Sequence, residues 1–372
     1  MKNILIISSE YPPGPGGVAK HAADLALALT KKGYSIDVLS PQDYTDPISA
    51  ERYRQFLPAD LNVFVLPRIG WNTHINRVIL ILKQLKNKKY DRIILTGIFP
   101  LWMGIIIRLV KGKKQPIDMF VHGSEIKLEN QFKRSLTNLS LKQADYIWAV
   151  SSYSKYLLPP ALQKQSNIQI LPNGIHPLEW EGFNSGMPYI GWKGNPKLLT
   201  VGNLTNRKGQ HRVVKALLDI IKVCPDAHYH MVGLPTNEKE IMDLARQLGV
   251  ANHITIHGRL PGRLELASAY KTADVFIMLS ENQADGDVEG FGIAILEANY
   301  FGLPAIGAKG CGIADAIIVG KTGELVDGNN SAEIVDAIKK IIQKKDSYSK
   351  YLPEWIQSHD WNNLVEKFID KK

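Results

Sequence analysis

The chain has 372 residues, 45% of them hydrophobic, which suits two domains of ordinary size with apolar cores of their own. Its formal charge of +9 comes from the first half, because residues 1–175 hold 23 Lys and Arg against 12 Asp and Glu. Two distant cysteines without CxxC spacing argue against a disulfide framework or a zinc site, and no apolar stretch reaches the ~18 residues of a membrane span.

The chain opens on a pattern typical of a strand, a glycine-rich turn and a helix. Residues 4–7 fit a strand better than a secretion signal, so we expect a cytoplasmic protein. Gly16 and Gly17 precede an apolar helical face that ends near Gly33, and a second strand follows over residues 35–39. Glycines at a helix entrance let a phosphate approach the first-turn amides, although a Gly-Pro turn is often only a turn.

More strands alternate with helices in the first half, which predicts a parallel sheet. They are expected over residues 62–66, 92–96, 119–121, 146–151 and 168–171. The carboxyl ends of the strands carry the chemistry in such sheets, and His122 stands directly after one of them, in the string His-Gly-Ser-Glu. A lone histidine there is more often a hydrogen-bonded surface residue than a catalyst, so both interpretations stay open at this point.

Basic runs over residues 83–92 and 108–114 lie beside apolar residues. Such a surface suits an anionic membrane, where each near-surface cation contributes roughly 1 kcal/mol. Solvated helix faces without a partner are the alternative. The sequence has no zinc-finger or RNP-like motif, so we expect no nucleic-acid partner.

An irregular segment over residues 177–196, rich in Gly, Pro and Trp, predicts a linker to a second domain. That domain begins with a strand over residues 198–201, and the loop after it leads into a helix. Cations at a helix N-terminus oppose the helix dipole, so Arg207 and Lys208 are easier to explain if they bind an anion.

The second sheet is expected to continue through strands over residues 227–232, 254–257 and 274–279. His228 and His230 share one face of the first of these strands, which is a spacing that metal ligands can have. No third ligand is evident, so packing is the simpler interpretation.

Residues 281–304 are the most informative stretch. A polar loop ends at Glu289, glycines follow it, and the apolar run 293–301 predicts a helix stopped by Gly-Leu-Pro. A helix N-terminus binds phosphate and the carboxylates of Glu289 and Glu297 can accept hydroxyls, so the stretch suits a sugar nucleotide. Two glutamates at this spacing are also common on solvated helices.

The same loop contains Asp285 and Asp287, a D-x-D pair that could hold a divalent metal on a donor diphosphate. That alternative requires a nucleotide-binding domain near the N-terminus, with the aspartates in the first half of the chain. These two lie near its end, so we expect no metal.

Together these motifs resemble the retaining glycosyltransferases of family 4, which have the GT-B fold. The resemblance rests on the Pro-Pro…Gly-Gly loop, the His-Gly-x-Glu string, the Pro-Asn-Gly before the linker, the Lys-Gly pair and the Glu-x7-Glu spacing, and it spans nearly the whole chain. It implies an α/β protein with two Rossmann-like, doubly wound domains facing a cleft. The expected parts are an acceptor-side domain over residues 1–175, a linker over 176–196, a nucleotide-sugar-binding domain over 197–350 and a C-terminal helix over 351–372 that crosses back to the first domain.

The resemblance also implies the site residues. His122 and Glu289 would be the catalytic pair, the first over the donor sugar and the second, with the amides after it, on the sugar and distal phosphate. Glu297 would hold the ribose, and Arg207 and Lys208 the diphosphate. The other nucleotide-sugar-binding residues would be Gly16, Gly17, Asn203, Arg259, Leu260, Phe291, Gly292 and Ile293. Family members commonly have Arg where this chain has Asn203, so either Arg207 supplies that cation or one cation serves alone.

The resulting prediction is a retaining, metal-independent hexosyltransferase that uses GDP-mannose or a UDP-hexose. Its acceptor would be lipid-linked or of the polysaccharide type, as in cell-envelope polysaccharide or glycolipid biosynthesis, and no cofactor is expected beyond the donor. We expect it in the cytoplasm, with a peripheral place on the inner face of the plasma membrane as the open alternative. A GT-B-fold nucleotide-sugar epimerase and a non-catalytic sugar-nucleotide-binding protein remain as other functions. A nicotinamide-dependent oxidoreductase would need a dinucleotide fingerprint that the first loop lacks.

Overall fold

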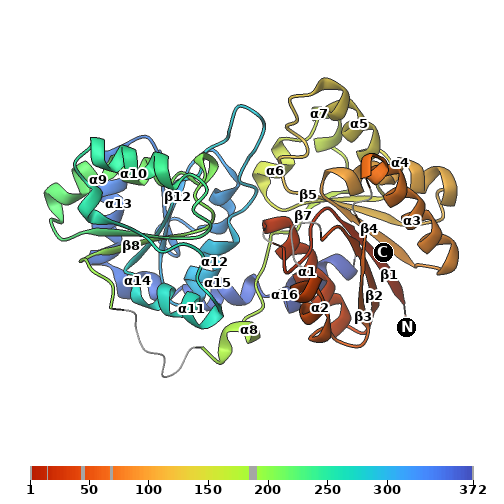
Figure 1. The fold of residues 1–372 in the computed structure, drawn as a ribbon, viewed down its shortest axis with the longest axis horizontal. Coiled ribbons are helices and arrows are strands. Elements are labelled where there is room, and N and C mark those ends of the chain that lie inside the picture. Colours follow the sequence, from red (N-terminus) through yellow and green to blue (C-terminus); the bar gives the residue numbers. More distant parts are fainter. Residues whose placement is uncertain (1, 15, 43–46, 68–69, 184–190, 371–372) are drawn as a thin grey trace. The chain divides into compact units, whose positions relative to one another are not determined.

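The computed structural model describes residues 2–14, 16–42, 47–67, 70–183 and 191–370. The chain forms two compact units, the first from residues 1–174 and 361–372 and the second from residues 175–360. Each unit contains one parallel sheet with helices packed on it (Figure 1). Part of the predicted linker, residues 184–190, lies outside the described residues.

The first unit has a seven-stranded sheet in the order β3-β2-β1-β4-β5-β6-β7. Its strands are β1 Asn3–Ser8, β2 Ser35–Ser40, β3 Leu61–Val65, β4 Arg92–Thr96, β5 Ile117–Val121, β6 Tyr146–Ala149 and β7 Ile168–Ile170. Its helices are α1 Gly17–Lys31, α2 Pro47–Gln55, η1 Gly70–Asn72, α3 Thr73–Asn87, α4 Ile98–Lys111, α5 Gln131–Leu141, α6 Ser152–Tyr156, α7 Pro160–Gln163 and α16 Trp361–Ile369. Residues 4–7 of β1 are buried on both faces, which explains why the strand is a continuous apolar run.

The second unit has a six-stranded sheet in the order β10-β9-β8-β11-β12-β13. Its strands are β8 Lys197–Val201, β9 His228–Val232, β10 Ile254–Ile256, β11 Val275–Met278, β12 Ala305–Ala308 and β13 Gly323–Val326. Its helices are α8 Leu178–Glu181, η2 Asn206–Lys208, α9 Gln210–Val223, α10 Glu238–Gln247, η3 Ala251–His253, α11 Arg263–Thr272, α12 Ile293–Tyr300, η4 Gly312–Ala316, α13 Ser331–Gln343, α14 Lys345–Ser349 and α15 Leu352–Ser358. Each strand named in the sequence analysis is present, with ends within two residues of the prediction.

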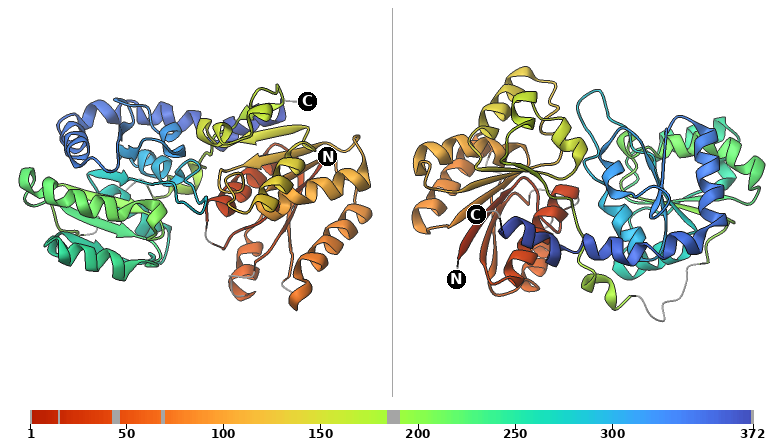
Figure 2. Two further views of the ribbon diagram at one scale, coloured as in Figure 1. Left: turned by 90° about the horizontal axis from the view of Figure 1, so that it is seen from above. Right: turned by 180° about the vertical axis from the view of Figure 1, so that it is seen from behind.

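The last helix returns to the first unit, as predicted. Trp361, Leu364, Val365 and Phe368 of α16 are buried there, and α16 packs against α1, as the rear view in Figure 2 shows. The single helix expected over residues 351–372 is two helices in the structure. Residues 359–360 separate them because Asp360 pairs with Ile175 in a parallel β-bridge, which is incompatible with a helical backbone.

The two histidines of β9 take part in packing. The Nε2 atom of His228 lies 2.8 Å from the Thr255 hydroxyl, and the ring of His230 stacks on Trp192 with 4.3 Å between centroids. The Nδ1 atom of His230 also lies 3.0 Å from Nε2 of His257. The rings of His228 and His230 therefore contact residues of β10, the residue that follows it, and the segment before β8.

Candidate active site

The loops that hold most of the predicted residues lie at one place in the second sheet. One loop follows β8 and the other follows β11, and these two strands are neighbours in the sheet. From β8 the chain adds β9 and β10 on one side, and from β11 it adds β12 and β13 on the other. This is the topological switch point of an open α/β sheet, where ligands bind beyond the carboxyl ends of the strands.

Gly209 allows the two loops to touch. Its φ is +75°, and a Cβ atom built there would lie 1.9 Å from the carbonyl oxygen of Leu279. The amide of Glu281 donates a hydrogen bond of 2.9 Å to the carbonyl oxygen of Arg207, which joins the loops. A side chain at Gly209 would push them apart.

This contact brings Arg207 and Lys208 onto the carboxylate of Glu289. Lys208 Nζ lies 2.8 Å from Glu289 Oε2. Arg207 forms an ion pair with the same oxygen and a second one, of 2.9 Å, with Asp287. Burial raises the pKa of Glu289, but Lys208 and Arg207 outweigh it, so the net shift is downward and the carboxylate is ionised.

Glu297 lies one turn into α12, where it is buried. Its Oε2 atom accepts a hydrogen bond of 2.8 Å from the hydroxyl of Tyr270, in α11. Burial and the carboxylate together raise the pKa of Tyr270 well above its usual value, so the phenol keeps its proton and donates. Tyr270 thus fixes the orientation of the second glutamate of the predicted pair.

The α12 helix begins after Gly292, whose φ of +88° favours glycine. No acidic residue occupies the first turn, so its amide end keeps its positive dipole. Ile293 is the first residue of the helix. The side chain of Phe291 is buried and its ring packs 6.0 Å from that of His359, so only the backbone of Phe291 is available to a ligand.

Other predicted residues of the second unit lie apart from this cluster. Asn203 Oδ1 accepts a hydrogen bond of 3.4 Å from the amide of Leu234, so the side chain is directed toward the loop after β9. Arg259 is exposed and Leu260 half-buried on the loop after β10. Strand β9 separates β10 from β8, so the sheet places these two residues beside the switch point and not within it.

The first unit holds the remaining predicted residues. His122 follows β5, and its Nε2 atom lies 2.8 Å from the hydroxyl of Thr96 at the end of β4. Glu125 accepts a hydrogen bond from the backbone amide of His122. Burial raises the pKa of Glu125 to about 7, although backbone amides stabilise its charged form. The His-Gly-Ser-Glu turn is therefore closed by its own glutamate.

The glycine pair forms the entrance to α1, which starts at Gly17. Gly16 has a φ of +131°, and a Cβ atom there would lie 2.3 Å from Oε2 of Glu10. Glu10 therefore packs over the glycine turn, and burial raises the pKa of its carboxyl group. Sequence reasoning missed Glu10 and Tyr270, because neither belongs to the motifs and their partners follow only from the fold.

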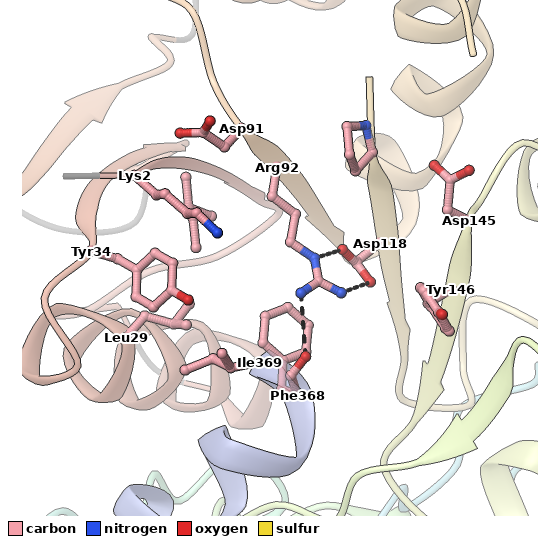
Figure 3. Close-up of a pocket in the computed structure, with 12 residues that line it drawn as sticks. Lys2, Leu29, Tyr34, Asp91, Arg92, Asp118, Asp145, Tyr146, Phe368 and Ile369 are labelled. Carbon is pink, nitrogen blue, oxygen red and sulfur yellow. Dashed lines mark hydrogen bonds and ion pairs between the residues drawn. The ribbon is translucent and has the colours of Figure 1, made fainter. Parts of the chain in front are cut away.

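A pocket of about 370 Å³ lies at the opposite, amino-terminal end of the first sheet. In Figure 3 the guanidinium of Arg92 lies between the carboxylate of Asp118 and the backbone carbonyl of Phe368. None of the predicted site residues lines this pocket. Arg92 thus fastens the end of α16 to the sheet.

Two further features bear on the predictions. In the ranges that the structure describes, no group of three or more His, Cys, Asp or Glu side chains is arranged to hold a metal ion. Asp285 accepts a hydrogen bond from the amide of Asp287, and Asp287 pairs with Arg207. Among the described helices, none combines the length and apolar character needed to cross a membrane.

Comparison with known proteins gives matches over both units. The family described as Glycosyltransferase Family 4 matches residues 15–177, and the one described as Glycosyl transferases group 1 matches residues 190–354. The GDP-mannose-dependent alpha-(1-6)-phosphatidylinositol monomannoside mannosyltransferase of Mycobacterium tuberculosis is 24% identical over 100% of this chain and 98% of its own. The D-inositol 3-phosphate glycosyltransferase of Corynebacterium urealyticum is 29% identical over 46% of this chain and 41% of its own.

Solved structures of the same architecture cover the whole chain. Sucrose-phosphate synthase from Thermosynechococcus elongatus has a TM-score of 0.79 at 18% identity and matches 100% of this chain and 98% of its own. Anabaena HepE, in complex with UDP and glucose, has a TM-score of 0.77 at 18% identity and matches 100% of this chain and 99% of its own.

The two doubly wound sheets and the returning last helix define the GT-B fold. The two family models match consecutive parts of the sequence. The first model covers most of the first unit, and the second covers most of the second unit. The chain belongs to glycosyltransferase family 4.

Proposed function

We propose that this glycosyltransferase moves a hexose, with retention and without a metal, from a nucleotide diphosphate sugar to a lipid-linked or polysaccharide-type acceptor. The observation that carries the proposal is the cluster of Arg207, Lys208 and Glu289 at the switch point of the second sheet. GDP-mannose is the first donor to test, because the full-length M. tuberculosis relative is GDP-mannose-dependent.

The donor diphosphate would take the place of carboxylate on the two cations. Arg207 and Lys208 are largely buried, with side chains 24% and 16% exposed, and both pair with Glu289. A diphosphate is a stronger partner for an arginine and a lysine than one carboxylate is, because it brings more charge and more acceptor oxygens. Its arrival would release Glu289 to accept hydroxyls of the sugar.

The α12 helix would hold both ends of the donor. Its amide end, after Gly292, suits the distal phosphate. Glu297, held by Tyr270 at one oxygen, would accept the ribose hydroxyls. Asp287, already paired with Arg207, would keep that guanidinium in place and would have no metal to bind.

Retention would follow from the chemistry that the family is thought to use. The departing phosphate takes the proton of the acceptor hydroxyl on the face from which it leaves, so no protein base is needed. The catalytic contribution of the protein would then be positioning and charge stabilisation. His122 would supply part of that positioning from the first unit.

A membrane-bound acceptor would also explain the basic first unit. On α3, Ile75 and Ile79 are 59% and 56% exposed, and the exposed Lys83 and Lys86 continue the same face at helical spacing. An apolar and basic stripe of this kind suits an anionic lipid surface. The enzyme would then work as a cytoplasmic protein at the inner face of the plasma membrane.

Co-sedimentation with vesicles tests the membrane proposal by itself. Phosphatidylglycerol vesicles at low salt should pull down the wild-type chain, while neutral phosphatidylcholine vesicles should not. The Lys83→Ala, Lys86→Ala double variant should bind about 30-fold more weakly, from about 1 kcal/mol for each cation. Equal sedimentation of the wild-type chain with both kinds of vesicle would contradict the membrane proposal, and Lys83 and Lys86 would then be solvated residues without a partner.

Product analysis distinguishes the proposed function from its alternatives. Incubation with the donor and a membrane extract should give free nucleotide and a new glycosidic bond of the donor's own anomeric configuration, measurable by NMR. A changed sugar still attached to the nucleotide would indicate an epimerase. Donor that binds and is never consumed would indicate a sugar-nucleotide-binding protein, and an inverted linkage would contradict the proposal.

A further inference from the structure

A histidine that belongs to none of the predicted motifs contacts His122. His21 lies in α1 and is fully buried. Its ring centroid is 4.8 Å from that of His122, with the rings nearly perpendicular at 81°. Phe120 and Trp361 enclose the same ring at centroid distances of 4.6 and 5.4 Å.

One hydrogen bond fixes the orientation of His21. Its Nδ1 atom lies 2.8 Å from Oδ1 of Asn173. An amide oxygen only accepts, so Nδ1 carries the hydrogen and donates it. Burial lowers the pKa of His21 to about 4, against the effect of the Asn173 hydrogen bond, so the ring is neutral near pH 7 and held as one tautomer.

The ring of His122 has supports from two other elements. The Thr96 hydroxyl, at the end of β4, reaches its Nε2 atom at 2.8 Å. His21, from α1, packs edge-on against the ring. The backbone of His122 is held separately, since its carbonyl oxygen accepts a hydrogen bond of 3.0 Å from Ser154. Thr96 and His21 therefore determine where the imidazole points.

The partners of His21 lie next to both chain connections of the first unit. Asn173 stands just before the chain leaves that unit after Gly174, and Trp361 is the first residue after it returns. The two connections are themselves joined, because the amide of Ile175 donates a hydrogen bond of 3.0 Å to the carbonyl oxygen of His359. His21 thus connects His122 to the two places where the first unit is covalently tied to the second.

We propose that His21 is a positioning residue for sugar transfer, which holds the imidazole of His122 in its working orientation and ties that orientation to Asn173 and Trp361. The proposal rests on the role proposed above for His122. Phenylalanine would fill the same space but has no donor for Asn173, so the hydrogen bond is what the histidine adds at this buried place. His21 would act through His122 and would not touch the sugar.

The first experiment separates positioning from folding and from donor binding. His21→Phe should lower kcat for sugar transfer by about 10- to 100-fold, the usual effect of small misplacements of a reacting group. KM for the donor should stay within about twofold, because the residues proposed for the diphosphate and the ribose, Arg207, Lys208 and Glu297, belong to the second unit. Tyr90→Phe is the matched control, since it removes a buried hydrogen bond of 2.6 Å to Asp37 in the same unit and should lower stability without changing kcat.

A double-mutant cycle then asks whether His21 acts through His122. If it does, His21→Phe should have no further effect on kcat in a His122→Ala background. Multiplying effects would overturn the positioning role, as would unchanged kcat in the single variant. If His21→Phe does not fold, Asn173→Ala takes its place in the cycle, because it leaves the histidine and removes its anchor.

The same cycle tells apart two kinds of failure. Wild-type kcat in His122→Ala would refute the proposed role of His122 and the positioning role with it. A strongly impaired His122→Ala variant combined with a fully active His21→Phe variant would refute the positioning role alone, and the proposed site would stand.

Discussion

The lysine at the centre of the proposed donor site can be tested by its removal. Lys208→Ala leaves one cation for the diphosphate and should lower kcat/KM for the donor by about 100-fold, a loss of roughly 2.7 kcal/mol. Steady-state kinetics measures this. The control is Lys222→Ala, which removes an exposed lysine paired with Asp219 on α9 and should leave kcat/KM unchanged. Equal kinetics in the two variants would contradict the assignment of Lys208.

Tyr270 offers a gentler test of Glu297. Tyr270→Phe keeps the ring, which stacks on Phe301 at 5.7 Å, and removes only the hydrogen bond to the carboxylate. This hydrogen bond is present before the donor binds, so only the lost orientation of Glu297 weakens binding, and we expect a loss of about tenfold, below the 1.5–3 kcal/mol of the bond itself. Calorimetric titration with the nucleotide diphosphate measures the affinity. Unchanged affinity would contradict the role of Tyr270 in orienting Glu297 for the ribose.

The site residues within one motif could be predicted, because they stand close together in the sequence, as Glu289 and Glu297 do. The side chains with which these residues pair could not be predicted. Arg207 meets Asp287 only because β8 and β11 are neighbours in the sheet, and sequence periodicity does not give strand order. Membership of a motif also does not give the direction of a side chain. Phe291 stands in a motif that predicts ligand contact, but its side chain packs against His359.

At the scale of the element, β2 carries a buried carboxylate that binds side chains of β3 and of the segment between α3 and β4. Asp37 accepts hydrogen bonds from Tyr90 at 2.6 Å, Lys88 at 2.8 Å and Asn62 at 3.1 Å. Burial raises the pKa of Asp37, but these partners outweigh it and the net shift is downward. Asp37→Asn should lower the free energy of unfolding by about 1–3 kcal/mol at pH 7, because the three donors then bond to a neutral amide oxygen, which is a weaker acceptor than a carboxylate.

The pH dependence of that cost has a definite sign. A lowered folded-state pKa gives stability that is present above the unfolded value, about 3.9 for Asp, and is lost as the pH falls through the folded-state value. The difference in unfolding free energy between wild type and Asp37→Asn should therefore shrink below about pH 4. Urea titrations between pH 7 and pH 3 measure it. A difference that stays constant over this range would contradict the role of the charge.

Strand positions were the easiest elements to predict, because each buried parallel strand is a short apolar run bounded by turns. The division between α15 and α16 was missed. Residues 352–369 have the composition of one helix, and the break at Asp360 depends on pairing with Ile175, far away in sequence. A local pattern holds no information about such a partner.

At the scale of the whole molecule, the first unit depends on α16, because the chain leaves this unit after residue 174 and completes its core only at residues 361–372. Phe368 is fully buried against Phe120 and Trp148, at ring distances of 5.8 and 5.2 Å. Phe368→Ala should lower the unfolding free energy of the first unit by about 3–5 kcal/mol. Nucleotide affinity, which is assigned to the second unit, should not change. A loss of affinity without a loss of stability would contradict this division of labour.

The central claim is that Arg207, Lys208 and the Glu289–Glu297 segment activate a nucleotide diphosphate sugar without a metal. The most direct measurement is the release of nucleotide from a panel of GDP-, UDP- and ADP-sugars, with and without EDTA, by the wild-type chain and by Lys208→Ala. We expect release from one donor that survives EDTA and falls about 100-fold in the variant. Release that disappears in EDTA would contradict the claim and would assign the diphosphate to a metal held by Asp285 and Asp287.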